Sequence, residues 1–353
     1  MSKVSFNYPK SPFFTVLSER VEAYFKENKI NSTGNYRLFS KAIFLFSLFV
    51  TFYVLLLTIQ PGWISVILCI GFGLNFAAIG FNIMHDGAHG SFSQKKWLNE
   101  ICAYTLNIIG GSSFMWKIKH NIIHHSFVNI EEVDDDIDIQ PWMRVSHGQR
   151  RYWFHKFQYF YWIILYGVTF LLWVLYLDYQ KYFSRKIASY EINKISLKEH
   201  FIFWGSKLAY LFVYFVIPIY FVGFANWMIG YLIMSFVTGL TISVVFQLAH
   251  VIEDVEFPKL NDENKIDNEW AVHQVETTAD FSTKNKFVTW FLGGLNFQVV
   301  HHLFPKVSHV HYPKLQKIVK ETCDQFQVKY MEYKSVWAAL RSHVRHLKVL
   351  GAK

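Results

Sequence analysis

Four apolar runs of membrane-spanning length constrain the fold of this chain more than any other feature. They cover residues 41–60, 63–84, 203–222 and 227–249, and a fifth run, 157–177, is nearly as apolar. A helix needs about 20 apolar residues to cross the hydrocarbon core of a bilayer. The sequence therefore predicts an all-α integral membrane protein.

The four runs form two hairpins. Gln60, Pro61 and Gly62 mark a turn between the first two runs, and the last two runs join near residues 223–226. The formal net charge of +9 is spread through the segments between the runs. Basic residues beside membrane helices usually mark the cytoplasmic side and its anionic lipids. Because no nucleic-acid-binding motif accompanies the charge, we expect no nucleic-acid partner.

Three histidine clusters lie at or beyond the ends of these runs. They are HDGAH with His85 and His89, HNIIHH with His120, His124 and His125, and QVVHH with His301 and His302. Histidines four residues apart share one helix face. Imidazole binds iron, zinc, copper and nickel, and seven imidazoles exceed what one tetrahedral ion uses. The pattern predicts a polynuclear metal centre beside the membrane.

The number of crossings follows from the requirement that all clusters lie on one side of the membrane. Between His125 and His250 the number of crossings must then be even. The hairpin 203–249 supplies two, so the run 157–177 should lie in the interface or re-enter without crossing. Basic residues that follow this run favour the cytoplasmic side. We therefore expect four transmembrane helices in two hairpins, cytoplasmic termini and a histidine-rich cytoplasmic cap.

This topology divides the chain into three parts. Residues 1–40 form a cytoplasmic N-terminal segment, 41–325 the membrane and catalytic domain, and 326–353 a cytoplasmic C-terminal tail. The N-terminal segment has an apolar side typical of an interfacial helix. That side is made of Val16, Leu17, Val21, Tyr24 and Phe25.

The order HxxxH, HxxxHH and QxxHH, alternating with two hairpins, resembles the membrane fatty-acid desaturase family over roughly residues 40–325. The most specific part is GGLNFQVVHHLFP at 293–305. Each of these histidine motifs is called a box. Glutamine at the first position of the third box, Gln298, resembles the pattern of the front-end subgroup. Enzymes of that subgroup insert a double bond between an existing one and the carboxyl end of the acyl chain. The continuation KVSHVHYP at 306–313 looks like the cyanobacterial-type delta-6 enzymes.

The resemblance implies an oxidoreductase with a non-haem di-iron centre, which activates O2 and removes two hydrogens from an unactivated acyl chain. The seven box histidines would be the iron ligands. His250 matches the position of a further ligand in related acyl-CoA desaturases, and Gln298 is a ligand candidate through its oxygen or a bound water. Mostly neutral imidazole ligation leaves iron electrophilic, with open positions for oxygen.

Other polar residues are candidates to orient the imidazole rings or their waters. They are Asp86, Asp134, Asp136, Asp138, Asn129 and Asn296. The stretch 136–139 also looks like one that recurs in the family after the second box, although an acidic run is commonly a solvated loop. His273 and Trp270 are candidates for the substrate path, with the protein surface as the alternative.

The remaining histidines carry no pattern that predicts a ligand. We expect His309, His311, His343 and His346 at the membrane interface or the protein surface. His147, His155 and His200 lack a partner pattern.

Two electrons per turnover must come from a separate carrier, such as a ferredoxin or a cytochrome b5-like protein with its reductase. The sequence has no HPGG haem motif, so we expect no fused cytochrome b5-like domain. Basic residues could dock an acidic carrier or, equally, the membrane surface. They are Lys117, Lys119, Arg144, Arg150, Arg151 and Lys156.

Two other functions remain as alternatives. Membrane hydroxylases share the histidine scaffold, and spacing does not distinguish them from desaturases. A metal transporter is disfavoured, because the spans are almost free of charge while the clusters lie at their ends. The substrate is expected to be an acyl-CoA or an acyl-lipid in the bacterial cytoplasmic membrane, or in the endoplasmic reticulum of a eukaryote.

Overall fold

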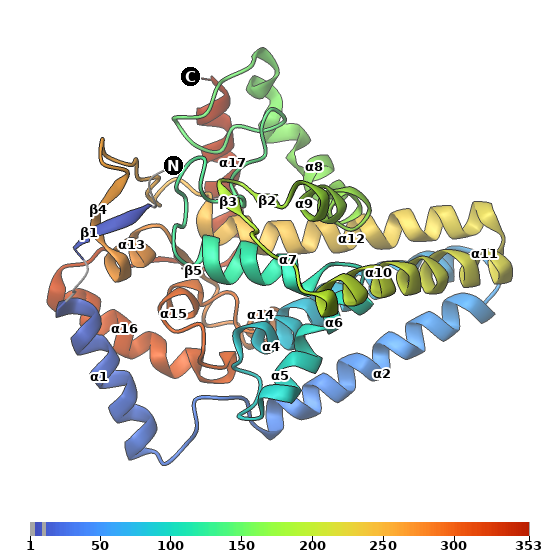
Figure 1. The fold of residues 1–353 in the computed structure, drawn as a ribbon, viewed down its shortest axis with the longest axis horizontal. Helices are drawn as coiled ribbons and strands as arrows, with labels where there is room; N and C mark the ends of the chain where they lie inside the picture. Colours follow the sequence, from blue (N-terminus) through green and yellow to red (C-terminus); the bar gives the residue numbers. More distant parts are fainter. Residues whose placement is uncertain (1–3, 9–11, 353) are drawn as a thin grey trace.

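The molecule has a bundle of long helices at one end and a cap of short elements at the other (Figure 1). The computed structural model describes residues 4–8 and 12–352. Helices α2 (Tyr36–Thr58), α10 (Leu197–Leu211), α11 (Ile217–Val222) and α12 (Phe224–His250) run lengthwise through the bundle. Helix α3 (Trp63–Ile79) packs against both α2 and α12.

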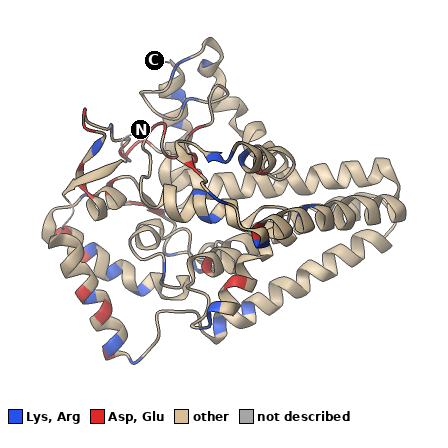
Figure 2. Ribbon diagram, in the orientation of Figure 1, with Lys and Arg blue, Asp and Glu red and all other residues tan. Residues whose placement is uncertain are grey.

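Within residues 4–8 and 12–352, five helical segments are long and apolar enough to cross a membrane. They are Tyr36–Thr58, Trp63–His89, Trp153–Ser184, Leu197–Val222 and Phe224–His250. Charged side chains are nearly absent along most of the lengthwise helices and gather at the cap (Figure 2). Four of these segments cover the predicted spans, except that the first helix ends at Thr58, two residues before the end of the predicted span 41–60. The fifth contains the ambiguous run 157–177.

The fifth segment differs in direction from the others. Its main helix, α8 (Gln158–Leu172), packs on α12 but crosses it in Figure 1 instead of running along the bundle. It continues through a π-helical turn, η4 (Trp173–Leu177), into α9 (Asp178–Ser184). Helix α8 belongs to the side of the bundle that faces helix α17 (Val336–Ala352) of the cap.

Two further π-helical turns precede or contain the histidine clusters. The first, η1 (Gly80–Met84), leads into α4 (His85–His89), and α7 (Ser113–Lys117) leads into the second, η2 (Ile118–His124). Short helices α5 (Lys96–Ala103) and α6 (Thr105–Ile108) join the two regions. A π turn inserts an extra residue and rotates the side chains that follow, which is why such turns are frequent at functional sites.

The cap is built around the third cluster. Its helices are α1 (Pro12–Glu27), α13 (Trp270–Glu276), α14 (Lys286–Phe291), α15 (Gln298–Leu303), α16 (Tyr312–Phe326) and α17. Three two-stranded sheets accompany them: β1 (Ser5–Tyr8) with β4 (Lys265–Glu269), β2 (Lys186–Ile187) with β3 (Tyr190–Glu191), and β5 (Ala279–Phe281) with β6 (Met331–Tyr333). The first and third pairs are parallel.

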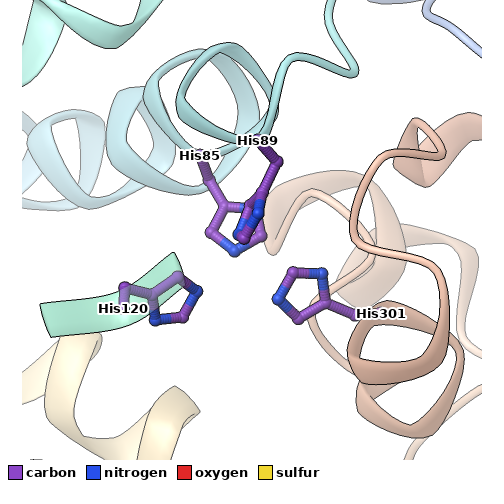
Figure 3. Close-up of side chains that lie close together, drawn as sticks. All are labelled: His85, His89, His120 and His301. Carbon is purple, nitrogen blue, oxygen red and sulfur yellow. The ribbon is translucent and has the colours of Figure 1, made fainter. Parts of the chain in front are cut away.

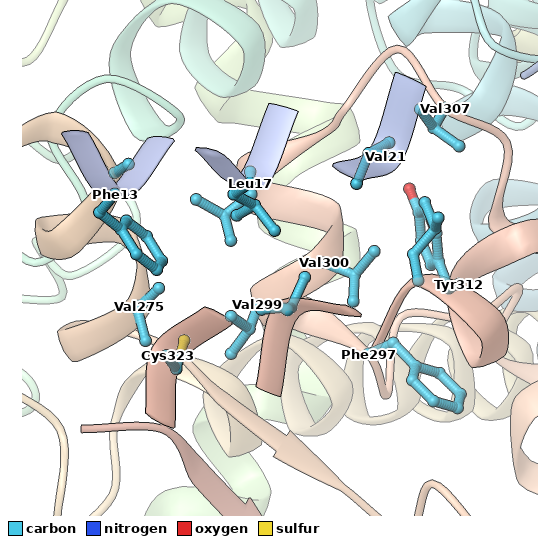
Figure 4. Packing of buried hydrophobic residues seen from close by; sticks show 14 residues of the cluster. Phe13, Leu17, Val21, Val275, Phe297, Val299, Val300, Val307, Tyr312 and Cys323 are labelled. Carbon is cyan, nitrogen blue, oxygen red and sulfur yellow. The ribbon is translucent and has the colours of Figure 1, made fainter. Parts of the chain in front are cut away.

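Helix α1 packs against α16 and α13 and closes an apolar cluster that includes residues of α15. Its residues Phe13, Leu17 and Val21 are buried in one cluster with Val299 and Val300 of α15 (Figure 4). The apolar side that the sequence shows on this segment therefore packs on the cap. The assignment of residues 1–40 to the membrane interface stays a prediction.

The loop before α15 depends on two glycines in the left-handed region. Gly293 has φ +59° and Gly294 has φ +72°. A Cβ on Gly293 would lie 2.5 Å from the carbonyl oxygen of Phe81, and one on Gly294 would lie 2.8 Å from Cβ of His309. These positions require glycine both for conformation and for space, and the close approach of Gly293 to Phe81 brings this loop against η1.

Asp280 in β5 fixes the start of α15. Its carboxylate accepts the backbone N–H of Val299 at 3.0 Å, Nε2 of Gln316 at 2.9 Å, and the hydroxyl of Tyr330. Burial raises the pKa of Asp280 to about 7, against the opposing effect of these three donors. The anchor therefore includes a carboxyl group that titrates near neutral pH.

Replacing Asp280 by asparagine should reduce the pH dependence of stability. The unfolded chain loses this proton near pH 4 and the folded one near pH 7, so the wild-type protein should lose stability as pH rises through that window. We expect the thermal unfolding midpoint of the wild-type protein in detergent to be lower at pH 7.5 than at pH 5. The difference between the two pH values should be smaller for Asp280→Asn. Asp324→Asn, at an exposed position of α16, is the control. Parallel pH profiles for Asp280→Asn and wild type would contradict the assignment.

Candidate metal centre

Four histidines from all three clusters meet in one buried group. His85 and His89 come from α4, His120 from η2 and His301 from α15, and one ring nitrogen of each lies within 4.8 Å of the others. Figure 3 shows the four rings pointing toward a common centre. We call these residues the first histidine group.

A second group lies beside the first. One ring nitrogen each of His124, His250 and His302 lies within 4.8 Å of the others. His125 links the two groups, because it forms another such set with His301 and His302, and its ring centroid lies 4.8 Å from that of His89. All eight rings are buried or nearly so, and together they form one histidine cluster.

The backbone of η2 explains how three histidines of one segment reach both groups. The backbone N–H of His125 donates to the carbonyl oxygen of His120, five residues earlier, at 3.1 Å. The π turn therefore places His120 and His125 one above the other, with their Nε2 atoms 3.2 Å apart. The α-helical spacing expected from HNIIHH does not apply here. His124 is turned toward the second group.

Most of these rings leave one buried nitrogen without a hydrogen-bond partner among the described residues. These atoms are Nε2 of His85, His89, His124, His250, His301 and His302, and Nδ1 of His125. A buried polar atom without a partner costs free energy, so a functional ligand is the simplest reason for so many in one place. Neutral imidazole nitrogens are suitable ligands for iron and other first-row metals, and the donor set fits such ions.

Partners at Nδ1 orient four of the rings. His124 contacts Asp134 at 3.0 Å, His302 contacts Oε1 of Gln274 at 2.9 Å, His301 contacts the Tyr312 hydroxyl at 3.1 Å, and His250 contacts the carbonyl oxygen of Thr277 at 3.3 Å. A proton on Nδ1 satisfies each acceptor. The lone pair of Nε2 then points into the cluster, which is the arrangement that metal-binding histidines use.

The electrostatic surroundings keep most of the cluster neutral. Burial and the neighbouring imidazoles hold the pKa values of His120, His125, His301 and His302 well below the ordinary range. Burial also opposes charge on His124, but the Asp134 and Asp136 carboxylates outweigh it and raise its pKa. Neutral rings are the form that binds metal.

The Asp86 side chain points toward the loop that follows α15. Its carboxylate accepts the Ser308 hydroxyl at 2.7 Å and contacts Nδ1 of His309 at 3.0 Å. The residue therefore ties α4 to the loop after α15, and His309 is buried. The expected interfacial or surface location of His309 is wrong, because this contact draws it inside.

The same correction applies to other histidines outside the boxes. His311, His343 and His346 are buried, and each bonds a backbone carbonyl oxygen. His155, which showed no pattern, is fully buried and bonds Pro141 O. These polar rings can be buried because backbone carbonyl oxygens accept their hydrogen bonds. The spacing of residues in the sequence does not reveal such backbone partners.

The acidic and amide candidates lie in different environments. Asp136 contacts Nδ1 of His124 at 3.5 Å and pairs with Lys119 at 2.6 Å, whereas Asp138 is exposed. Asn129 donates to the carbonyl oxygen of His250 at 2.8 Å and so fixes the end of α12. Asn296 donates to the Thr289 hydroxyl at 3.1 Å, in the loop between α14 and α15.

The two candidates for the substrate path are also placed. The indole N–H of Trp270 donates to the carbonyl oxygen of His125 at 3.1 Å. His273 is fully buried on α13, with its ring edge-on to Phe6, so its alternative surface location is wrong. Gln298 is buried on α15, one turn before His302.

The sequence gives no direct indication of several side chains that contact the cluster. Gln274 and Tyr312 orient His302 and His301, and the Trp116 ring stacks on His120 with centroids 4.3 Å apart. Tyr312 belongs to the KVSHVHYP stretch, which offered a signal through the resemblance. Gln274 and Trp116 belong to none of the histidine motifs, so only the fold shows that they contact the cluster.

Comparison with known proteins agrees with the geometry. Residues 61–334 match the fatty acid desaturase family. An acyl-lipid (8-3)-desaturase of Physcomitrium patens is 38% identical over 96% of this chain and 72% of its own length. The sn-1 linoleoyl-lipid 6-desaturases of Arthrospira platensis and Synechocystis sp. are both 35% identical, over 99% and 97% of this chain and 95% and 96% of their own lengths. The resemblance drawn from the histidine boxes is thereby confirmed: the chain belongs to the fatty acid desaturase family and is an oxidoreductase of lipid metabolism.

Proposed function

We propose that this protein introduces a double bond into the acyl chain of a membrane lipid, with two iron ions held by the histidine cluster. The observation that carries the proposal is the pair of histidine groups with unpartnered inward nitrogens, in a chain whose family desaturates fatty acids. The relatives named above are acyl-lipid desaturases, which favours an acyl-lipid over an acyl-CoA.

Each histidine group would hold one ion. His85, His89, His120 and His301 would bind the first, and His124, His250 and His302 the second. His125 lies where it can bind on either side. Gln298, which shares a face of α15 with His302, remains a candidate for an open position. Bound iron would supply the activation of O2 and the removal of two hydrogens.

The chain's own residues would orient the ligands and keep water away. Asp134, Gln274 and Tyr312 hold rings through Nδ1 and fix the tautomer that binds metal. Trp116 stacks on His120, and the Phe246 ring lies 4.9 Å and 5.0 Å from those of His124 and His250. These aromatic walls suit an apolar chain beside the cluster.

We also propose that four helices cross the membrane and that the cap is cytoplasmic. All eight cluster histidines meet in one place, so the number of crossings between His125 and His250 must be even. The segment Leu197–Val222 and helix α12 supply two, and α8 runs across the bundle in Figure 1. Trp153–Ser184 would therefore lie along the interface.

The electron donor would be an external carrier that approaches the cap. Several expected docking residues are engaged within the chain: Lys117 pairs with Glu100, Lys119 pairs with Asp135 and Asp136, and Arg144 is buried. Arg150, Arg151 and Lys156 remain exposed. They adjoin α17, since the Arg151 side chain donates to Gly351 O. This narrower basic surface would be the docking face.

Removing one cluster ligand should abolish the reaction. In a host with defined fatty acids, wild type should give new unsaturated lipids that depend on O2 and a reductant, with one double-bond position. His302→Ala, which removes one nitrogen of the second group, should reduce product below detection and lower bound iron, while His147→Ala at an exposed position should match wild type. Hydroxylated lipids in place of unsaturated ones would favour the hydroxylase. Full activity of His302→Ala would overturn its role.

Replacing His309 should be far from neutral. His309→Ala leaves the buried Asp86 carboxylate without one of its two partners, which costs about 1–3 kcal/mol and loosens α4 against the third cluster. We expect reduced iron content and activity at unchanged expression, measured beside His147→Ala. Wild-type iron content in His309→Ala would show that this contact does not position the cluster.

Labelling from the two sides of the membrane tests the crossing number. Single cysteines replacing Asn193, between α9 and α10, and Lys334, in the cap, should be labelled from the same side. A cysteine replacing Gln60, between α2 and α3, should be labelled from the other side. All three positions are exposed, and the native cysteines are buried. If Asn193→Cys is labelled together with Gln60→Cys, then Trp153–Ser184 crosses and the four-span topology is wrong.

A further inference from the structure

Lys41 is a buried cation with an unusual environment. It lies near the cap end of α2, on the inward face that also buries Leu38, Ala42 and Leu45, and only 9% of the residue is exposed. Its Nζ lies 5.0 Å from the ring centroid of Trp290 on α14. Among the described residues it has no hydrogen-bond or ion-pair partner. An ammonium held this close to apolar surface, with no anion beside it, is costly, so such groups are usually functional.

The nearest attractive charge within the chain does not complete the site. The Asp86 carboxylate attracts Lys41 through space, but it is already bound by Ser308 and His309 and makes no ion pair with Lys41. Leu38, Ala42 and Leu45, which share the inward face of α2 with Lys41, pack in one cluster with Ile83 of η1 and Cys102 of α5. This face of α2 therefore lies beside the elements that lead into and support α4, where His85 and His89 begin the cluster. An external anion at Lys41 would therefore sit near the end of the histidine cluster.

The surroundings identify the kind of anion. The start of α2 is where the uncharged part of the bundle meets the charged cap (Figure 2). Trp290 and Phe287 of α14 and Phe44 of α2 are exposed there, as aromatic residues commonly are at the headgroup level of a membrane. Arg37, one turn before Lys41, and Lys286, one turn before Trp290, are exposed cations on the same two helices. Cations beside apolar surface at this level suit a lipid phosphate.

We propose that Lys41 and Trp290 form a binding site for the phosphate group of a glycerophospholipid substrate. This inference rests on the proposed function for its substrate role, although the binding itself does not. Lys41 would donate to the phosphate, Trp290 would cover the cation, and the exposed apolar side chains of α2 and α14 would contact the acyl chains. Fixing the headgroup beside α4 would set which carbon reaches the cluster, counted from the carboxyl end.

The binding test uses purified protein in detergent micelles, with phosphatidic acid as the probe and diacylglycerol with the same acyl chains as the phosphate-free control. Wild type should gain thermal stability with phosphatidic acid but not with diacylglycerol. Lys41→Met keeps the length of the side chain and removes its charge, so it should fold well. It should weaken the apparent affinity by about tenfold or more, the loss expected for one charge-assisted hydrogen bond. Lys41→Arg should retain most of the affinity.

Lys95→Gln, which removes one exposed charge elsewhere at the edge of the cap, is the matched control and should behave as wild type. Equal affinity of Lys41→Met and wild type, or equal stabilisation by both lipids, would overturn the site. In a desaturation assay, Lys41→Met should raise KM for a phospholipid more than it lowers kcat, and should broaden the double-bond position. If phosphate binding is lost but KM and position stay unchanged, the site holds a boundary lipid and the substrate role is wrong. If no variant makes a product while binding follows Lys41, the proposed function fails and the phosphate site stands.

Discussion

The rest of the structure is organised around buried imidazole nitrogens that have no partner among the described residues. Burying them costs free energy that only a bound ligand would offset. Eight rings, seven from α4, η2, α12 and α15 and that of His125 directly after η2, direct their nitrogens into one small volume. Without ions, that volume concentrates unpaired lone pairs in the protein interior, where water is scarce. Two bound ions would turn this cost into cross-links between segments that are more than 200 residues apart.

The elements around the cluster can be understood as the means of holding rings in place. A π turn in η2 directs His120 and His124 into different groups, and Asp134 orients the ring of His124 from outside. On the opposite side, Asp280 fixes the start of α15. Near the start of α2, the proposed phosphate site would likewise hold a group against Lys41, which has no ion pair among the described residues.

Much of this could be predicted from the sequence because spacing and length carry the information. The apolar runs predicted the long helices of the bundle, and the spacing of the histidines predicted that the three sequence clusters converge. Contacts between distant segments left no such trace. The burial of His309 depends on Asp86, which lies on a helix 223 positions earlier in the chain, and Gln274 reaches His302 only through the packing of α13 on α15. Lys119 likewise pairs with Asp135 and Asp136 because the acidic stretch folds onto η2.

The most direct test of the central claim is the metal content of the purified protein, measured by mass spectrometry against the protein concentration. We expect about two iron ions per chain, as two histidine groups joined by His125 require, and an exchange-coupled spectroscopic signal from neighbouring irons. A single ion per chain, or stoichiometric zinc in place of iron with desaturase activity retained, would contradict the account.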